Sequence, residues 1–180
     1  MGVMYDYFAA PSDTAAAETV MLEAGPGGPT PASPALQEAI RARDREAIRL
    51  AMRPKVRMSD SGFLVLDTKG IDPAVQMGTL EALLTGGQYD VVVSRPRAGH
   101  LIAGDGQEGP WVVTLSDELQ AALAAASREQ IVAVAGPWWE TEEFHGQGDP
   151  ETLALFLLEF ADLARQANGL GERLYCWICL

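Results

Sequence analysis

The residues with the greatest potential for chemistry lie in one short stretch near the start of the last quarter of the chain. It contains two adjacent tryptophans, three carboxylates and one of the two histidines: Trp138, Trp139, Glu140, Glu142, Glu143 and His145. Aromatic surface, acid and a titratable ring coincide nowhere else in the sequence. We therefore expect a ligand or partner to bind there, because tryptophans at a surface often act as binding anchors.

These side chains would also allow two kinds of catalysis. A metal ion could be held by one of the three glutamates together with His145, since carboxylate and imidazole groups are common ligands. Crowded carboxylates raise one another's pKa, which suits general acid–base work in a hydrolase. The structural alternative is a polar loop that Trp138 or Trp139 pins to the core while the acids face water. The residues alone leave these alternatives open.

A smaller basic cluster follows a predicted strand and consists of Arg95, Arg97 and His100. Guanidinium groups bind phosphate and carboxylate well, so the cluster is a second candidate, for an anion. Charges that protect an edge strand from pairing with another sheet would explain the same residues, and we favour that interpretation.

Three patterns resemble known motifs but lack the context that the chemistry requires. Cys176 and Cys179 have redox spacing, but residues three apart in a strand face opposite sides. The glycines of residues 104–109 have dinucleotide-binding spacing, but a predicted strand follows them, which indicates a hairpin loop. Glu142 and His145 form one Glu-x-x-His, whereas di-iron bundles use two. We therefore predict no cofactor and assign no metal ligand.

Hydrophobic periodicity and capping residues predict the elements that position these candidates. The expected strands are residues 3–8, 63–66, 90–94, 100–103, 111–115, 131–135 and 173–179. The expected helices are residues 12–23, 33–52, 72–84, 116–126 and 149–168. Helices and strands interleave and several strands are linked as hairpins. We predict an α+β fold over residues 1–180, a single compact domain with a mixed, mostly antiparallel sheet and helices packed on it.

The overall charge constrains the partners. The formal net charge is −12, from 25 acidic and 13 basic residues, so the field of the protein repels a nucleic-acid backbone. No run is apolar enough to span a membrane, and the first residues lack the basic and apolar regions of a signal peptide. We therefore expect a cytoplasmic protein, and the abundance of Arg, Ala and Gly with little Lys indicates a bacterial one.

One segment departs from this acidic character. From Arg41 to Arg57 there are seven cations and two acids. Such a basic helix could meet an acidic partner or the acidic remainder of its own chain. A solvated helix face with internal ion pairs is the simpler interpretation, and we prefer it.

Several short stretches resemble the YfbM-like family of bacterial proteins of unknown function. Residues 1–8 resemble the opening of that family, and residues 80–86 resemble its Leu-Leu-Thr-Gly helix end. Residues 116–126 resemble a helix that follows its central strand, and a long final helix, a glycine and a closing strand complete the likeness. Residues 74–79 lack the Trp and His that the family often carries there. The resemblance implies a compact α+β domain and no particular activity.

The sequence thus favours a non-catalytic domain that binds a partner protein or a small cationic ligand through the stretch from Trp138 to His145. The alternative is a hydrolase or metal-dependent enzyme that uses Glu140, Glu142 or Glu143 with His145. A homodimer is also possible, formed through aromatic strand edges near Tyr5, Tyr7 or Trp177.

Overall fold

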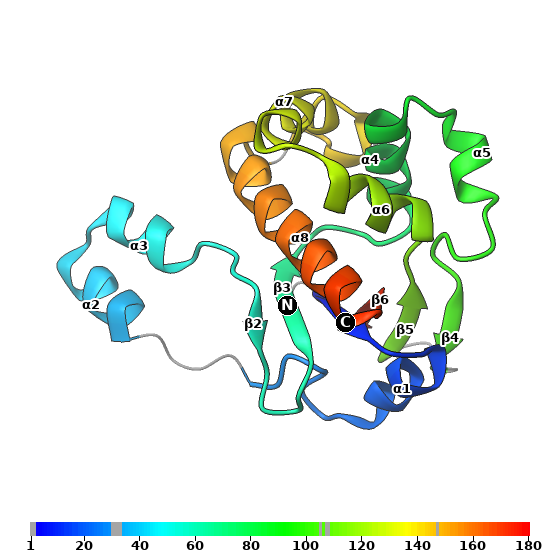
Figure 1. The fold of residues 1–180 in the computed structure, drawn as a ribbon. Coiled ribbons are helices and arrows are strands. Elements are labelled where there is room, and N and C mark those ends of the chain that lie inside the picture. Colours follow the sequence, from blue (N-terminus) through cyan, green and yellow to red (C-terminus); the bar gives the residue numbers. More distant parts are fainter. Residues whose placement is uncertain (1–2, 30–33, 105, 107–108, 147) are drawn as a thin grey trace.

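The centre of the molecule is a six-stranded sheet in which all neighbouring strands of the described chain are antiparallel (Figure 1). The computed structural model describes residues 3–29, 34–104, 106, 109–146 and 148–180. The strand order β2-β3-β1-β6-β5-β4 pairs the first and last strands in the middle. The predicted α+β class is confirmed, and the sheet is antiparallel rather than mixed. The strands are β1 (Met4–Ala10), β2 (Arg57–Met58), β3 (Leu64–Lys69), β4 (Leu101–Ala103), β5 (Trp111–Thr114) and β6 (Arg173–Cys179).

Helices surround this sheet and account for most of the remaining described chain (Figure 1). Among the described residues, none of these helices combines the length and the apolar character needed to cross a membrane. The α-helices are α1 (Asp13–Glu18), α2 (Pro34–Ala42), α3 (Arg45–Ala51), α4 (Val75–Thr85), α5 (Tyr89–Val93), α6 (Asp117–Ala125), α7 (Arg128–Trp139) and α8 (Pro150–Leu170). Two short 3-10 helices are η1 (Thr19–Met21) and η2 (Glu142–Phe144).

The long helix α8 lies across the first face of the sheet, and α6 and α7 pack against it (Figure 1). Asp149 caps α8 by accepting from the Thr152 amide at 2.9 Å, as Asp149-Pro150 predicts. The helix continues past the predicted stop at residue 168 and ends at Gly171, whose φ of 70° suits a left-handed cap. The core beneath it is aromatic, since Tyr7 packs against Phe160 with ring centroids 5.0 Å apart.

The second face of the sheet is covered by α1, η1 and the segment that follows them (Figure 1). Strand alternation sends Phe8 to this face, together with Val65, Tyr175 and Trp177 of neighbouring strands. This apolar cluster is much smaller than the one under α8. The second face therefore has room for polar side chains in its interior.

Two predicted strands are helices in the structure. Residues 90–94 fall largely in α5, and residues 131–135 lie inside α7. A short apolar run does not distinguish a strand from a buried helix by periodicity alone. For α7 the decisive signal lies just before the run. The Ser127 hydroxyl accepts from the Gln130 amide at 3.2 Å, and Gln130 Oε1 accepts from the Ser127 amide at 2.8 Å, a capping box that starts a helix.

The predicted helix of residues 33–52 is split in two. Arg43 adopts a left-handed φ of 53° after α2, and Asp44 then caps α3 by accepting from the Glu46 and Ala47 amides at 3.0 Å. The predicted cap Ser33 lies outside the described residues. Helices α2 and α3 form a hairpin, here called the arm (residues 34–52), which projects from the side of the molecule (Figure 1).

Candidate functional site

Trp138 belongs to the core and not to the surface. It lies in the last turn of α7, is fully buried, and donates its indole N–H to the Gln76 carbonyl at 2.9 Å. Its ring meets Phe144 edge-on, with centroids 4.9 Å apart, and stacks near Phe156 at 6.5 Å. The hypothesis that Trp138 contacts a partner is therefore inconsistent with its position. Its role is to hold the start of the acidic stretch against α4 and α8.

The other residues of the predicted site differ in how far they are buried. Trp139 is half-buried against the edge of the same core. Glu140 and Glu142 are exposed, whereas Glu143 is half-buried. Because the glutamates point into different environments, the crowded carboxylate group expected for acid–base work is not assembled. Within the described chain, no three His, Cys, Asp or Glu side chains gather closely enough to hold a metal ion.

Glu143 and His145 are the two members that the structure brings to a common cleft. η2 positions Glu143, and its Oε1 accepts from the Thr79 hydroxyl of α4 at 3.1 Å. The Gln76 amide donates to the Glu143 carbonyl at 3.5 Å, which ties η2 to α4. His145 ends η2 with a left-handed φ of 50° and is exposed. This backbone turn brings His145 to the wall of the cleft.

The environment of Glu143 keeps its carboxylate charged. Burial raises the pKa of this carboxyl, but several groups outweigh burial and place the pKa below its usual value. They are the nearby Thr141 hydroxyl, the backbone amide of Glu143, the Thr79 hydroxyl and the charge of His145. Oε2 is shielded from solvent and receives no hydrogen bond from the described residues. A desolvated carboxylate oxygen of this kind favours a ligand that can donate to it.

The cleft beside Glu143 has a volume of about 330 Å³, which is within the usual range of small-molecule sites. Its walls come from the end of β3, the start of α4, η2 and the start of α8. They combine apolar side chains with a few polar ones. Those that matter most are Lys69, Ile71, Gln76, Glu143, Phe144, His145, Leu153 and Phe156.

The basic cluster lies elsewhere and is engaged with acids of its own chain. Arg95 pairs with buried Glu81 and with Glu118 at 3.7 Å. Arg97 pairs with Asp13 at 2.6 Å and with Asp117 at 3.2 Å. His100 is exposed and its carbonyl accepts from the Thr114 amide at 2.9 Å. An anion would have to compete with these carboxylates, and the anion site stays a prediction.

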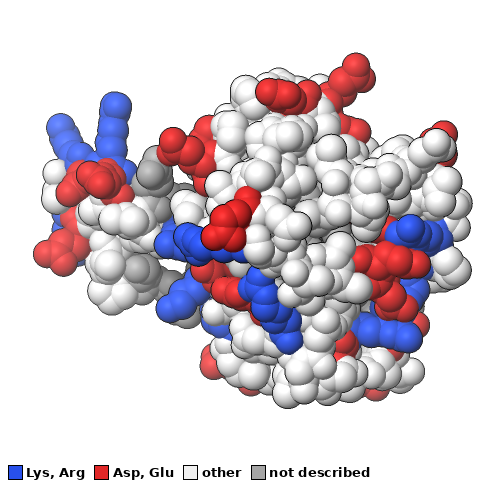
Figure 2. All heavy atoms as spheres, turned by 45° about the horizontal axis from the view of Figure 1, so that its top comes forward, with Lys and Arg blue, Asp and Glu red and all other residues white. Residues whose placement is uncertain are grey.

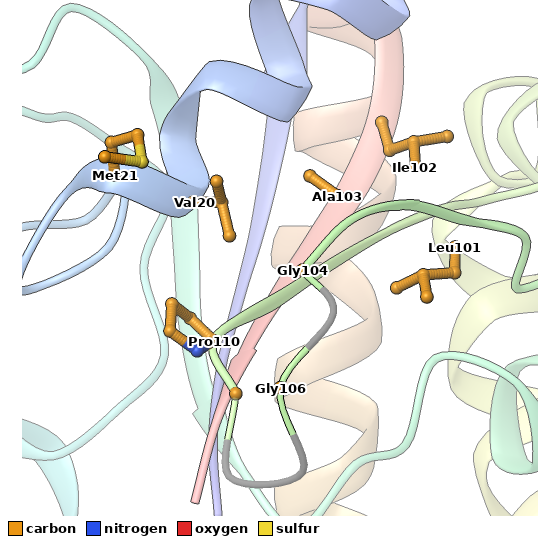
Figure 3. Close-up of a pocket in the computed structure, with 9 residues that line it drawn as sticks. Val20, Met21, Leu101, Ile102, Ala103, Gly104, Gly106 and Pro110 are labelled. Atoms are coloured by element: carbon orange, nitrogen blue, oxygen red, sulfur yellow. The ribbon is translucent and has the colours of Figure 1, made fainter.

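Gly104, Gly106 and Gly109 form one wall of an open hollow of about 600 Å³ (Figure 3). Val20 and Met21 of η1 form the other side, and β4 supplies Leu101, Ile102 and Ala103. The antiparallel pairing of β4 with β5 confirms the predicted hairpin, while Asp105, Gln107 and Glu108 lie outside the described residues. A strand and not a helix follows the glycines, so the dinucleotide interpretation has no helix N-terminus to use.

The cysteines are also placed as strand geometry requires. Cys176 lies in the core under α8, whereas Cys179 packs against the cluster of the second face. The two free thiols therefore point to opposite sides of β6.

A polar cluster that the sequence interpretation missed lies inside the second face. Asp6 in the middle of β1 is 3% exposed and faces Asp67 directly across the β1–β3 pair. Its Oδ2 accepts from the Gly27 amide at 2.9 Å. Arg57 donates to Asp67 at 3.0 Å and to the Gly27 carbonyl at 2.8 Å, which closes the network. A Cβ on Gly27 would lie 2.6 Å from Asp67 Oδ1, so only glycine permits this approach.

This network shifts the titration of Asp6 strongly. Burial raises the pKa of Asp6, the Gly27 amide lowers it, Asp67 raises it and Arg57 lowers it, and the resulting pKa is about 7. The signal in the sequence was a single aspartate within an otherwise aromatic and apolar strand. Because Asp6 is sealed from solvent, we regard the pair as an internal feature and the cleft beside Glu143 as the candidate site.

Comparison of the chain with protein families and curated proteins gave no match, and comparison of the fold with solved structures gave none either. The resemblance to the YfbM-like family thus stays a prediction from short motifs.

Proposed function

We propose that this is a cytoplasmic binding protein without catalysis, and that the cleft beside Glu143 holds a small cationic ligand. The observation that carries the proposal is the state of Glu143, a charged and half-buried residue on the wall of the cleft whose Oε2 is buried and accepts no hydrogen bond from the described residues. An ammonium or guanidinium group would supply the donor that Oε2 lacks, in a charge-assisted hydrogen bond.

The other walls indicate what the rest of the ligand is like. Ile71, Phe144, Leu153 and Phe156 offer apolar contact, so a short hydrocarbon body attached to the cation fits the cleft. Lys69 also lines it, but its side chain is exposed and remains solvated. The ligand class is therefore a small organic amine or guanidine and not a metal cation.

Calorimetric titration tests this with three probes of similar size: n-butylammonium, butylguanidinium and n-butanol. We expect the two cations to bind and the neutral alcohol to bind at least tenfold more weakly, since it lacks the charge that pairs with Glu143. Glu143→Gln keeps the shape of the side chain and should reduce cation affinity about tenfold or more, which corresponds to about 1.4 kcal/mol. The matched control is Glu142→Gln on the same turn, which is exposed and outside the cleft.

Two outcomes would contradict the proposal. One is unchanged cation affinity in Glu143→Gln. The other is equal binding of butanol and butylammonium. Because the pKa of Glu143 is lowered, cation binding should also persist on acidification to below the ordinary pKa of a glutamate.

The hydrolase alternative now rests on one pair, because only Glu143 and His145 of the predicted catalytic group share the cleft. It makes a different prediction for the same titration. Esters or amides of the bound amine would be converted to product, and His145→Gln would abolish turnover while it leaves binding of butylammonium intact. Retention of such compounds without conversion supports the non-catalytic function.

A further inference from the structure

The arm buries little of its own surface. Its two helices have nine and seven residues, lengths that are marginal for an isolated helix in water. Of the side chains described in them, only Ala39 is buried, although α2 is strongly amphipathic. Three large apolar residues of the arm are more than half exposed, Ile40 at 56%, Leu50 at 64% and Met52 at 66%. Exposed apolar groups that gather on a projecting element are typical of an interaction surface.

The charge of the arm is opposite to that of the body. Residues 34–52 contain four cations and three acids, whereas the rest of the chain has nine cations and 22 acids. Figure 2 shows basic side chains standing out from the arm, alongside acidic ones. Near its root, Arg53 pairs with Glu159 of α8 at 3.7 Å, and Glu159 also accepts from the Val56 amide at 3.1 Å. The root is thus fixed to the body, and the two helices extend beyond it.

A face with complementary properties lies on α4 and α5. Gly78 lets α5 approach α4 closely, since a Cβ there would lie 3.0 Å from Val93 and 3.1 Å from Tyr89. This approach leaves an apolar surface, with Val75 at 45% exposure and Val91 at 55%. The surrounding charge is acidic. Burial, and then Glu143, Asp72 and Asp90, raise the pKa of the Tyr89 hydroxyl.

The arm and this face lie at opposite sides of the molecule (Figure 1). The arm of one chain therefore does not cover its own α4–α5 face. A second copy of the chain brings the two surfaces together, and it matches them in both respects: apolar side chains against apolar side chains, and arginines against acids.

We propose that the arm of one copy docks on the α4–α5 face of a second copy. Ile40, Leu50 and Met52 then pack on the valines and Tyr89. Arg41, Arg43 and Arg45 lie beside Asp72 and Asp90. The contact joins two different surfaces, so it closes into a dimer only if each copy gives its arm to the other; otherwise it propagates into a ring or chain.

Sedimentation of the full-length protein tests the contact. Wild-type protein should associate with rising concentration, and its dissociation constant should increase with salt, because the pairs at the rim are screened. Leu50→Asp in the arm and Val91→Asp on the face should each raise the dissociation constant at least tenfold. Both positions are exposed, so the fold is retained. The matched control is Val132→Asp, an equally exposed valine of α7 (47%) outside both surfaces, which should change nothing.

A mixing experiment distinguishes this contact from a self-complementary one. The Leu50→Asp variant keeps an intact face, and the Val91→Asp variant keeps an intact arm. Each alone should be monomeric, whereas an equimolar mixture should form a one-to-one dimer through the single intact contact.

The proposal is overturned if wild-type protein stays monomeric at 0.1 mM, a concentration at about the weak end of specific association. It is also overturned if the two variants associate like wild type, or if their mixture stays monomeric while wild type associates. Monomeric protein that co-sediments with phosphatidylglycerol vesicles would instead assign the arm to an anionic lipid surface. Loss of amine binding through Glu143 has no bearing on these outcomes.

Discussion

The two faces of the sheet differ in what they bury. Apart from Glu81 of α4, which pairs with Arg95, the face under α8 buries aromatic and aliphatic side chains, and polar atoms such as the Tyr7 hydroxyl and the Trp138 indole N–H donate to backbone carbonyls. The other face holds a smaller apolar cluster and two sets of ionisable side chains: Asp6, Asp67 and Arg57, and Tyr175, Asp13 and Arg97. The stability that comes from apolar burial should not depend on pH. The stability that comes from the ionisable side chains should depend on pH, because these groups bind or release protons.

The largest effect is expected on the apolar face. Trp138→Ala removes a fully buried ring and leaves the Gln76 carbonyl without its donor. We expect it to lower the free energy of unfolding by about 3–5 kcal/mol, the range for large aromatic truncations. Urea denaturation should give the same loss at pH 5 and pH 8. Trp139→Ala, at the half-buried neighbour, is the matched control with a smaller loss. If the loss of unfolding free energy in Trp138→Ala depended strongly on pH, the proposed difference between the two faces would be contradicted.

The second effect belongs to Asp6. In the unfolded chain its pKa is near 3.8, and in the folded protein it is about 7, so the folded state holds the proton more tightly. The stability that this carboxyl contributes is therefore fully present below about pH 4 and is lost as pH rises to about 7. We expect wild-type protein to lose roughly 2–3 kcal/mol between pH 5 and pH 8 relative to Asp6→Asn, at about 1.4 kcal/mol per pKa unit.

Asp6→Asn is an informative variant because it mimics the protonated acid. Its carbonyl oxygen can accept from Gly27, and its amide can donate to Asp67. Urea denaturation at pH 5, 6, 7 and 8 should show the variant more stable than wild type at the highest pH. Parallel stability curves for the two proteins would show that the pair does not titrate as proposed.

The smallest effect is expected when a tyrosine hydroxyl is removed from either face of the sheet. Tyr7 donates to the Ile71 carbonyl and Tyr175 donates to Asp13, both at 2.8 Å. Tyr7→Phe leaves a buried carbonyl unpaired and should cost about 1–2 kcal/mol. Tyr175→Phe should cost less than about 1 kcal/mol, because Asp13 keeps its ion pair with Arg97. The pKa of Asp13, which Arg97 and then Tyr175 lower, should rise in Tyr175→Phe when followed by NMR. Equal losses in both variants would contradict the comparison.

The parts of the fold that the sequence predicted are those with a local physical cause. The structure has the predicted strands near residues 3–8 and 173–179, the helix starts capped by Ser116 and Asp149, and the apolar stripe of α8, each of which depends on neighbours in the chain. The errors arose where tertiary context decides. The run at residues 131–135 fits a strand or a helix equally well, and the break at Arg43 has no signal beyond the capping aspartate that follows it.

The sequence predicted only part of the candidate site, again because tertiary contacts decide which residues line it. Spacing along the chain brought six residues together, but only Glu143 and His145 line the cleft, since α7 turns Trp138 inward and leaves Glu140 outside. The other walls come from β3, α4 and α8, which no local pattern connects. The possible homodimer through strand edges near Tyr5, Tyr7 or Trp177 has no free strand edge to use there, because β1 and β6 are each paired on both sides. The sheet edges are β2 and β4.

The central pairing of β1 with β6 has a consequence for how the protein is made. During synthesis β1 leaves the ribosome before the other strands of the sheet, but β6, one of its two neighbours in the finished sheet, follows only after α8. Until then one edge of an aromatic strand stays unpaired, and the hydrophobic core cannot close. Contacts between such distant parts of a chain form slowly, and open strand edges promote aggregation. We therefore expect the sheet to close only after β6 has been synthesised, with a need for chaperones that increases when translation pauses before β6.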